Sequence, residues 1–313
     1  MNGIVKRFPG VVANDRVNFE LRAGEVHGLL GENGAGKTTL MNVLYGILRP
    51  EEGEIYIRGE KVDIGSPREA INLGIGMVHQ HFKLVEPHTV LENILLGLKE
   101  PAFILNVKDA ASKVLEISKR YELPIDPGAR IWQLSMGERQ RVEILKALYR
   151  GANILVLDEP TSVLTPPETK ELFTFIAQMA REGRSVVFIT HKLDEVMAAS
   201  DRVTVLRAGR NVDTLSREQL DKSKLASMMV GREVLFTLRK SPVVPGEPVL
   251  ELNHVTVMGD KGFPAVKNLT LDIRKGEILG VAGIAGNGQR ELTEAIAGMR
   301  PILAGQVQLC GKE

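Results

Sequence analysis

The chain has 313 residues, of which 43% are hydrophobic and 25% charged, a composition typical of one large globular domain or two ordinary ones. Its formal net charge of +1 excludes a strongly basic protein and gives no reason to expect a nucleic-acid partner. The single cysteine, Cys310, excludes an internal disulfide and fits a reducing compartment. The first ten residues lack the apolar core of a signal peptide, and no apolar run is long enough to cross a bilayer. We therefore expect any membrane association to be peripheral.

The first thirty residues are predicted to be rich in β-structure. Residues 17–22 alternate apolar and polar side chains, as a half-exposed strand does. Residues 26–30 are mostly apolar, which suits a buried parallel strand. From Leu40 onward, apolar residues recur at helical spacing. A strand over residues 26–30 and a helix that includes Leu40 are therefore predicted, joined by the residues from Gly31 onward.

Those residues form a predicted phosphate-binding loop, because residues 31–38 match G-x-x-x-x-G-K-T. The glycines let backbone N–H groups surround an anion, and the N-terminus of the following helix adds positive potential. Lys37 is expected to reach the β- and γ-phosphates of a nucleotide, and Thr38 to ligate Mg²⁺. Phe8 is expected either to stack on the base or to belong to the core. The loop residues expected to bind the nucleotide are Gly31, Glu32, Asn33, Gly34, Ala35, Gly36, Lys37, Thr38 and Thr39.

The next hundred residues are predicted to change from strand to helix. Residues 54–64 indicate two short strands joined by a turn, and a short helix is expected from Pro67 to Leu73. Residues 76–82 favour a strand that ends in polar side chains, among them Gln80. Residues 84–150 then lose the strand pattern and favour a mainly helical subdomain.

A helix start is predicted at the end of this subdomain. Ser135 and Glu138 have the S-x-x-E spacing of a capping box before an apolar-periodic run. Taken alone, these residues favour a capped helix and nothing more.

Polar side chains follow two further apolar strands. Residues 154–157 are aliphatic and are followed by Asp158 and Glu159, at the strand end where ligands sit in open α/β sheets. Buried charge is costly, so packing alone does not explain two acids there, although an acidic turn is the simpler alternative. Asp158 suits a Mg²⁺ site through water, and Glu159 suits orienting or deprotonating an attacking water. Residues 185–190 again form a mostly apolar run, and His191 follows them; it is expected at the same sheet edge. A lone histidine at a strand end is more often structural.

The remaining part of this first region is predicted to contain a strand and turn over residues 201–209 and a helix over residues 217–230, which ends at Gly231. Residues 232–248 contain three prolines and little periodicity, which is typical of a linker.

An internal repeat follows the linker. A constant offset of 252 positions superposes eight glycines of the first region on eight of the last. Residues 249–313 are therefore predicted to repeat the beginning of the first domain and to contain no counterpart of residues 76–230. In the second loop, Gln289 replaces Lys37 and Arg290 replaces Thr38. Nucleotide binding remains possible at the second loop, but hydrolysis there is expected to be weak or absent. The superposed pairs are Gly24/Gly276, Gly28/Gly280, Gly31/Gly283, Gly34/Gly286, Gly36/Gly288, Gly46/Gly298, Gly53/Gly305 and Gly59/Gly311.

Taken together, the motifs resemble those of the ATP-binding subunit of ABC transporters, over essentially the whole chain. An aromatic Phe8 precedes the Walker A loop at 31–38, and Gln80 matches the Q-loop. Residues 134–138, Leu-Ser-Met-Gly-Glu, match the signature, although Met136 stands where many members have glycine. Walker B ends at Asp158 with Glu159, residues 162–165 match the D-loop, and His191 matches the switch histidine.

The resemblance implies an α/β P-loop NTPase of the ABC ATPase type, with a mixed sheet, an antiparallel β subdomain and a helical subdomain at about 84–150. It implies a first ATPase domain at 1–231, a linker at 232–248 and part of a second, degenerate ATPase domain at 249–313. Within the family the chain is similar to tandem importers of simple sugars and nucleosides, whose chains are longer. A truncated tandem ATPase is therefore expected.

The same resemblance implies an ATPase that uses ATP and Mg²⁺, with Lys37, Glu159 and His191 as catalytic residues. The Mg²⁺ ligands are expected to be Thr38, Gln80 and Asp158, the last through water. Ser135, Gly137 and Glu138 are expected to contact the nucleotide of a partner ATPase domain, which is either the second half or a second copy of the chain. Two copies are expected to pair through their first domains, and the isolated chain is expected to hydrolyse ATP slowly.

The implied partners are transmembrane permease subunits and, indirectly, an extracellular or periplasmic solute-binding protein, at the cytoplasmic side of the cell membrane. No nucleic-acid partner is expected. Two other classes of protein remain open: a soluble ABC-type ATPase that acts on ribosomes or DNA, and a nucleotide-binding regulator that does not hydrolyse ATP.

Overall fold

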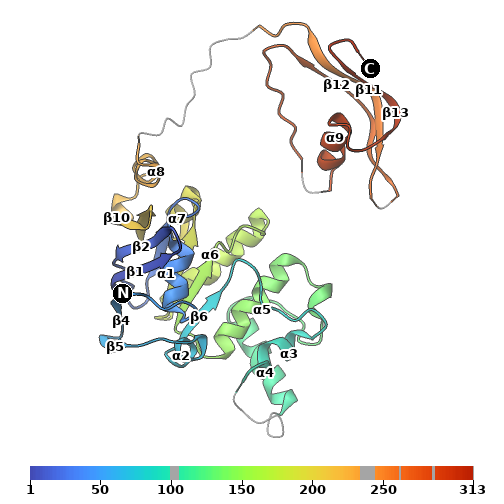
Figure 1. Cartoon of the computed structure of the whole chain (residues 1–313). Helices are drawn as coiled ribbons and strands as arrows, with labels where there is room; N and C mark the ends of the chain where they lie inside the picture. Colours follow the sequence, from blue (N-terminus) through green and yellow to red (C-terminus); the bar gives the residue numbers. More distant parts are fainter. Residues whose placement is uncertain (99–105, 233–243, 261, 284–285, 313) are drawn as a thin grey trace. The chain divides into compact units, whose positions relative to one another are not determined.

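The computed structural model describes residues 1–98, 106–232, 244–260, 262–283 and 286–312 (Figure 1). The chain divides into two compact units, residues 1–236 and residues 237–313. The predicted linker lies mostly outside the described residues, because only residue 232 and residues 244–248 of it are described. In the described part of the chain, no helix combines the length and the apolarity needed to span a membrane.

The first unit is built on a mixed sheet with the strand order β10-β9-β3-β8-β7-β6. Neighbouring strands from β9 to β6 pair in parallel, and β10 returns antiparallel to β9. Every residue of the central strand β3 is buried between β8 and β9, as predicted for residues 26–30. The strands are β3 (Val26–Leu30), β6 (Ile75–Val78), β7 (Ile154–Asp158), β8 (Ser185–Thr190), β9 (Arg202–Arg207) and β10 (Arg210–Ser216).

A separate antiparallel sheet, with the order β2-β1-β4-β5, forms the second layer of this unit. It confirms the short strands predicted within 54–64. The strand predicted over residues 17–22 is wrong, because β2 ends at Val17. The side chains beyond it still alternate, with Phe19 buried and its neighbours exposed, but the backbone N–H of Phe19 donates to the Met1 carbonyl outside any ladder. The alternation therefore predicted burial but not strand pairing. The strands are β1 (Asn2–Phe8), β2 (Val11–Val17), β4 (Glu52–Ile57) and β5 (Glu60–Val62).

Several helices connect and cover these strands. The helix predicted at residues 217–230 is split, because Asp221 caps a new helix by accepting from the Lys224 N–H. The strand predicted over residues 76–82 stops at Val78, which leaves Gln80 in a loop. The elements are α1 (Lys37–Leu44), α2 (Pro67–Asn72), α6 (Pro166–Arg181), α7 (Leu193–Ala199), the 3₁₀ turn η2 (Arg217–Gln219) and α8 (Lys222–Val230).

The predicted helical subdomain is present between β6 and β7, where α3, α4 and α5 lie together (Figure 1). Apolar side chains of these helices, such as Ile94, Val114 and Ile144, are buried in one cluster with residues of β3, β7 and β8. This packing fixes the subdomain against the central sheet. The elements are α3 (Val90–Leu95), α4 (Val107–Arg120), the 3₁₀ turn η1 (Ile131–Gln133) and α5 (Met136–Tyr149).

The second unit contains an antiparallel sheet with the order β12-β11-β13 and one described helix, α9. Leu252, Val255 and Val257 of the sheet pack against Leu292 and Ala295 of the helix in a small core. The elements are β11 (Pro248–Met258), β12 (Pro264–Arg274), α9 (Gln289–Ile296) and β13 (Ile302–Leu309).

Candidate functional site

The predicted phosphate-binding loop leaves β3 and enters α1 through Gly36. Gly36 has φ 96° and is the N-terminal cap of α1. A side chain at this position would collide with the Ala13 carbonyl oxygen, so the loop approaches β2 as only glycine allows. The Asn14 side-chain amide, which is fully buried, donates to the Gly36 carbonyl at 3.1 Å. Strand β2 of the antiparallel sheet therefore contacts the loop at Gly36 and helps to hold its conformation.

Lys37 lies in the first turn of α1 with its side chain folded back onto the loop. Its ammonium group donates to the Gly31 carbonyl at 2.8 Å and to the Glu32 carbonyl at 2.9 Å. Only 6% of the residue is exposed. Burial lowers the pKa of Lys37, and the nearby carboxylates of Glu159 and Asp158 act in the opposite direction. The arrangement holds a positive charge beside the glycine loop and the N-terminus of α1, which suits an anion.

Thr38 and Asp158 meet beside this lysine. Asp158 ends β7, is 2% exposed, and accepts a hydrogen bond from the Thr38 hydroxyl at 3.3 Å. Burial raises the pKa of Asp158, against the opposing effect of the Thr38 hydrogen bond. Hydroxyl and carboxylate oxygens are ligands that Mg²⁺ prefers. Within the described residues, no group of three or more His, Cys, Asp and Glu could hold a metal. These two residues therefore fit an Mg²⁺ ion that takes other ligands from phosphate and water.

Glu159 connects two other predicted residues. His191 Nδ1 lies 2.8 Å from Glu159 Oε1, and the Gln80 side-chain amide lies 3.4 Å from Glu159 Oε2. Glu159 has φ 46°, a conformation that non-glycine residues rarely adopt, and its N–H donates to the Ile189 carbonyl. The structure therefore brings together side chains that follow three different strands, β6, β7 and β8.

A cavity of about 460 Å³ lies over the loop. Phe8 is 42% exposed and borders this cavity, so the alternative that placed Phe8 in the core is wrong. An aromatic ring at this position is suited to stacking on a base. The cavity is lined by Phe8, Val11, Ala13, Asn33, Gly34, Ala35, Gly36, Lys37, Thr38, Thr39, Gln80 and Glu159.

Ser135, Gly137 and Glu138 lie at the start of α5 and do not line this cavity. The predicted capping box is confirmed: the Ser135 hydroxyl accepts from the Glu138 N–H, and the Glu138 carboxylate accepts from the Ser135 N–H at 2.8 Å. A side chain at Gly137 would collide with the Glu168 carboxylate. The start of α5 is therefore closely packed against the start of α6.

The glycine that precedes the helix has nearly the same backbone conformation in both glycine loops. Gly288 caps α9 with φ 90° and ψ 8°, against φ 96° and ψ 6° for Gly36. A side chain at Gly288 would approach the carbonyl oxygen of Ala265, the counterpart of Ala13 at the offset of 252. The side chains differ, because Val266 stands in place of Asn14 and Arg290 forms ion pairs with Glu294 and Asp260.

Sequence reasoning missed Asn14, which supports the loop through Gly36. The one available signal was a polar residue at an inward position of the strand over residues 11–17, and this signal does not reveal the partner.

Comparison with known proteins supports the same assignment of the loop. Residues 14–162 match the family model described as "ABC transporter". This part of the chain is an ABC transporter domain. The whole chain is 52% identical to a guanosine import ATP-binding protein of Bacillus subtilis and 47% identical to a glucose import ATP-binding protein of Haloferax volcanii, with 100% of this chain covered in each case. The chain spans 62% of the length of both relatives.

A solved ABC cassette shows the same fold as the first unit. The crystal structure of an ATP-binding cassette of an ABC transporter in its ADP conformation superposes with a TM-score of 0.64 and 26% identity. It covers 74% of this chain and 97% of the solved chain. The predicted fold class, a P-loop NTPase of the ABC ATPase type, is therefore confirmed for the first unit.

Proposed function

We propose that this ABC family chain is the ATP-binding and ATP-hydrolysing subunit that powers an importer of nucleosides or simple sugars. One observation carries the proposal: Gln80, Glu159 and His191 form one hydrogen-bonded group at the edge of the cavity that contains Lys37. A glycine loop alone binds phosphate, whereas hydrolysis also needs a group that orients water.

The proposed roles follow from the contacts. The backbone of residues 31–39 and the Lys37 ammonium bind the phosphates, and Phe8 stacks on the base. Thr38, Gln80 and, through water, Asp158 hold Mg²⁺, which neutralises charge on the transferred phosphoryl group when bound. Glu159 orients a water and accepts its proton.

His191 keeps Glu159 in place through the 2.8 Å contact and contacts the γ-phosphate.

A partner ATPase domain completes the proposed site. Ser135 caps the 14-residue helix α5, and Gly137 and Glu138 lie in its first turn. The positive dipole end of this helix, with the N–H groups that the capping box leaves free, suits a γ-phosphate held by the other domain. The partner is either the second half of a tandem protein or a second copy of this chain. The internal repeat at an offset of 252 residues favours the tandem arrangement.

The proposed domain organisation is a first ATPase domain at 1–231, a linker at 232–248 and part of a second, degenerate ATPase domain at 249–313. The matching backbone of Gly36 and Gly288 supports the duplication. It is also supported by a matching turn before each loop, where the Glu25 carboxylate accepts from the Arg22 N–H and the Glu277 carboxylate accepts from the Arg274 N–H.

The proposed partners are transmembrane permease subunits and, indirectly, a solute-binding protein, with the chain peripheral at the cytoplasmic side of the membrane. Support comes from the import function named for the relatives. Because one of these relatives is named for guanosine and the other for glucose, the proposal keeps both nucleosides and simple sugars as solutes.

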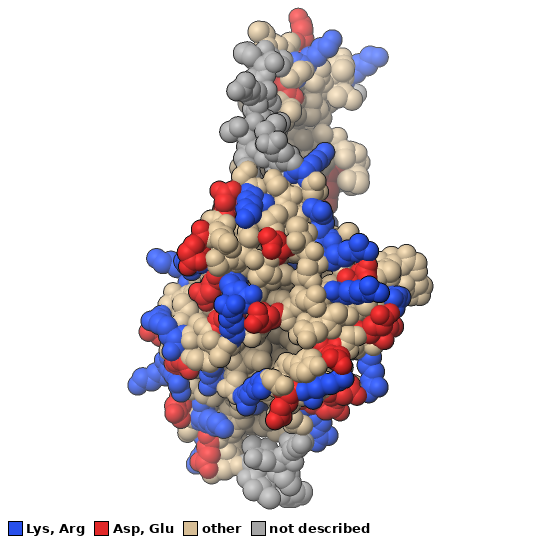
Figure 2. All heavy atoms as spheres, turned by 90° about the vertical axis from the view of Figure 1, so that its left-hand side faces the viewer, with Lys and Arg blue, Asp and Glu red and all other residues tan. Residues whose placement is uncertain are grey.

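Two other functions are compatible with an ATP-binding loop: an ATPase that acts on ribosomes or DNA, and a regulator that binds ATP without hydrolysing it. A soluble ATPase acting on ribosomes or DNA would depend on contact with phosphate backbone, but Figure 2 shows basic and acidic side chains interspersed over the face that it presents. A nucleotide-binding regulator would bind ATP without hydrolysing it.

Uptake of labelled guanosine, ribose and glucose by cells that produce the protein tests the proposal. We expect uptake of one of these solutes to require the protein and to be lost in Lys37→Ala. Uptake of all three that is unaffected by Lys37→Ala would contradict the importer function. Purified protein that binds ATP but shows no turnover, even with its permease, would favour the regulator.

A further inference from the structure

Glu195 is a buried carboxylate to which none of the roles above refers. It lies in the first turn of α7 and is 8% exposed. A carboxylate removed from water is costly unless it is paired and hydrogen-bonded. Its partners therefore indicate what this group does for the fold or for the site.

The two oxygens of Glu195 accept hydrogen bonds from two threonines of different segments. The Thr161 hydroxyl donates to Glu195 Oε1 at 2.5 Å, and the Thr190 hydroxyl donates to Glu195 Oε2 at 2.9 Å. Thr161 lies in the loop after β7, and Thr190 is the last residue of β8. Both threonines are buried, with 4% and 2% exposed. One carboxylate thus ties together the ends of two adjacent strands.

Lys192 completes this network. Its ammonium group donates to the Thr161 hydroxyl at 3.2 Å and lies 3.0 Å from Glu195 Oε1, while its backbone N–H donates to the Thr190 hydroxyl at 3.0 Å. Each threonine hydroxyl therefore both donates and accepts. The Lys192 side chain is 44% exposed, so the buried part of the network is the Glu195 carboxylate with its two threonines. Buried polar groups that are all satisfied are rigid, because any displacement leaves a group unpaired.

The two segments that Glu195 holds together, the loop after β7 and the end of β8, lead to Glu159 and His191. Thr161 follows Glu159 by two residues, and Thr190 directly precedes His191. Glu159 depends on its surroundings, because its backbone occupies a sparsely populated conformation. We propose that Glu195 is a positioning residue that sets the geometry of Glu159 and His191 for ATP hydrolysis. The proposal rests on the function proposed above, and Glu195 acts through the threonines, without lining the cavity.

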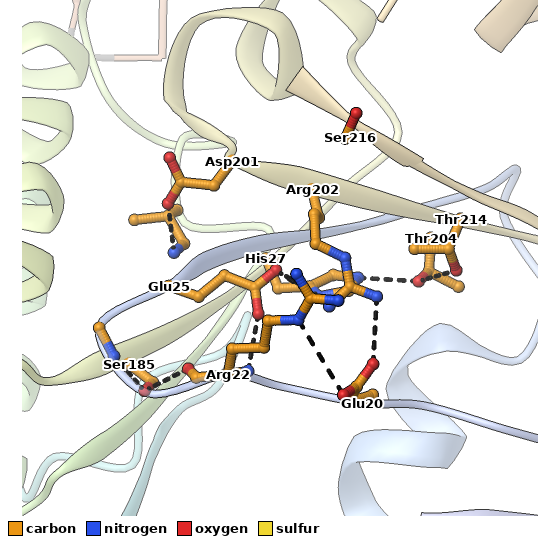
Figure 3. Close-up of polar contacts among 12 residues, drawn as sticks. Glu20, Arg22, Glu25, His27, Ser185, Asp201, Arg202, Thr204, Thr214 and Ser216 are labelled. Carbon is orange, nitrogen blue, oxygen red and sulfur yellow. Dashed lines mark hydrogen bonds and ion pairs between the residues drawn. The ribbon is translucent and has the colours of Figure 1, made fainter. Parts of the chain in front are cut away.

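Glu25 provides a matched control at the opposite end of the same sheet. It is 6% exposed and accepts from the Arg22 N–H at 2.7 Å, and Arg202 Nη1 lies 3.4 Å from it. His27 Nδ1 lies 3.3 Å from Glu25 Oε1. Figure 3 shows Glu25 among Arg22, His27 and Arg202. Glu25 therefore matches Glu195 in burial and in ion pairing, but it contacts its histidine directly and precedes β3 at the end away from the loop.

The kinetic experiment compares Glu195→Ala, Glu195→Gln and Glu25→Gln in the full chain. We expect Glu195→Ala to lower kcat for ATP by about 10- to 100-fold, the cost of a small misplacement, with KM within about twofold of wild type. Glu195→Gln keeps one acceptor oxygen and is expected to lose less activity. Glu25→Gln is expected to keep kcat within about twofold. Equal losses in Glu25→Gln and Glu195→Gln, or a KM that rises as kcat falls, would overturn the proposal.

A second measurement does not depend on turnover. In protein labelled with ¹⁵N-histidine, Glu195→Gln or Glu195→Ala is expected to shift the imidazole nitrogen resonances of His191 and to leave those of His27 in place. Glu25→Gln is expected to do the reverse, and His191→Gln assigns the signals. Unmoved His191 resonances in both Glu195 variants would overturn the proposal. Moved resonances in a chain without turnover would support the coupling and contradict the proposed function instead.

Discussion

The two glycine loops of this chain enter their helices with nearly the same backbone conformation but carry different side chains. Gly36 and Gly288 differ by only a few degrees in φ and ψ, and both pack against a carbonyl of the preceding hairpin. The first loop is followed by Lys37 and Thr38, and the second by Gln289 and Arg290. The entry into the helix therefore depends on this glycine and on a local hairpin, whereas the charge next to the loop depends on the two residues that follow the glycine.

The strands before the two loops differ even more. β3 is fully buried because β8 and β9 pair with it on either side. The corresponding residues 278–282 form no strand in the described second unit, where Ile278 is 81% exposed and Val281 is 58% exposed. A parallel strand requires neighbours that come from distant parts of the chain, whereas a glycine turn does not. The comparison assigns the proposed chemistry to the first unit alone.

The largest loss of ATP turnover is expected for a substitution at Glu159, which tests whether the first unit carries out hydrolysis. Glu159→Gln removes the proposed base and is expected to lower kcat by about 10²- to 10⁴-fold, with ATP still bound. Steady-state turnover and equilibrium nucleotide binding measure the two effects. Turnover that survives in Glu159→Gln would mean that hydrolysis does not depend on the first unit's carboxylate. Analytical ultracentrifugation of this variant with ATP also tests the predicted pairing of two copies, and a monomer would count against it.

The pH dependence of stability tests the buried carboxylate of Asp158, which is present only in the first unit among the described residues. Burial raises the pKa of Asp158 above its ordinary value of 3.8, so the folded state binds more protons than the unfolded state between these two pKa values. The stability contributed by this group therefore falls as pH rises through that window. Asp158→Asn is expected to stabilise the nucleotide-free protein at neutral pH, with the gain disappearing at acidic pH, while Mg²⁺-dependent turnover is lost.

Urea unfolding of wild type and Asp158→Asn at several pH values measures this difference. A difference in the free energy of unfolding that does not change with pH would contradict the account of Asp158.

Asn14 and its counterpart Val266 offer a smaller test. Asn14→Val copies the second unit and removes the hydrogen bond to the Gly36 carbonyl. Because such a bond contributes about 0.5–1.5 kcal/mol, we expect ATP affinity to fall by about two- to twelvefold. Val266→Asn is the matched control and should leave ATP affinity unchanged. Unchanged affinity in Asn14→Val would show that the loop does not need this support.

The smallest expected effect is at the second loop. Gln289→Lys combined with Arg290→Thr restores the phosphate-binding motif there, and it also breaks the Arg290–Glu294 ion pair. In a Lys37→Ala background we expect no recovery of ATP turnover, because the described second unit has neither a paired strand at 278–282 nor a counterpart of Glu159. Recovered turnover would mean that the loop sequence alone is sufficient.

Features of the chain that depend on local patterns were predictable from the sequence. The phosphate loop, the capping box of Ser135 and Glu138, and the strands ending at Asp158 and Thr190 follow from motif, cap and periodicity. Parallel strand ends share one edge, so the meeting of Glu159 with His191 was also expected.

Features that depend on tertiary contacts were not predictable. Side-chain burial alternates at residues 17–22 although these residues do not pair as a strand. For Phe8, the sequence did not distinguish a base-stacking role from a place in the core. Gly36, the partner of Asn14, lies 22 residues away in the sequence, and Thr161, one partner of Glu195, lies 34 residues away. Nothing in the local pattern identifies these two partners. Their roles depend on which elements pack together, which a single sequence does not reveal.

Calorimetric titration of the full chain with Mg²⁺ and ATP, for wild type, Lys37→Ala and Gln289→Ala, tests whether the nucleotide binds at the first glycine loop. The account predicts binding that weakens by about tenfold or more in Lys37→Ala, because charge-assisted hydrogen bonds contribute about 1.5–3 kcal/mol, and binding that is unchanged in Gln289→Ala. Binding that Lys37→Ala leaves intact, or that Gln289→Ala abolishes, would contradict it.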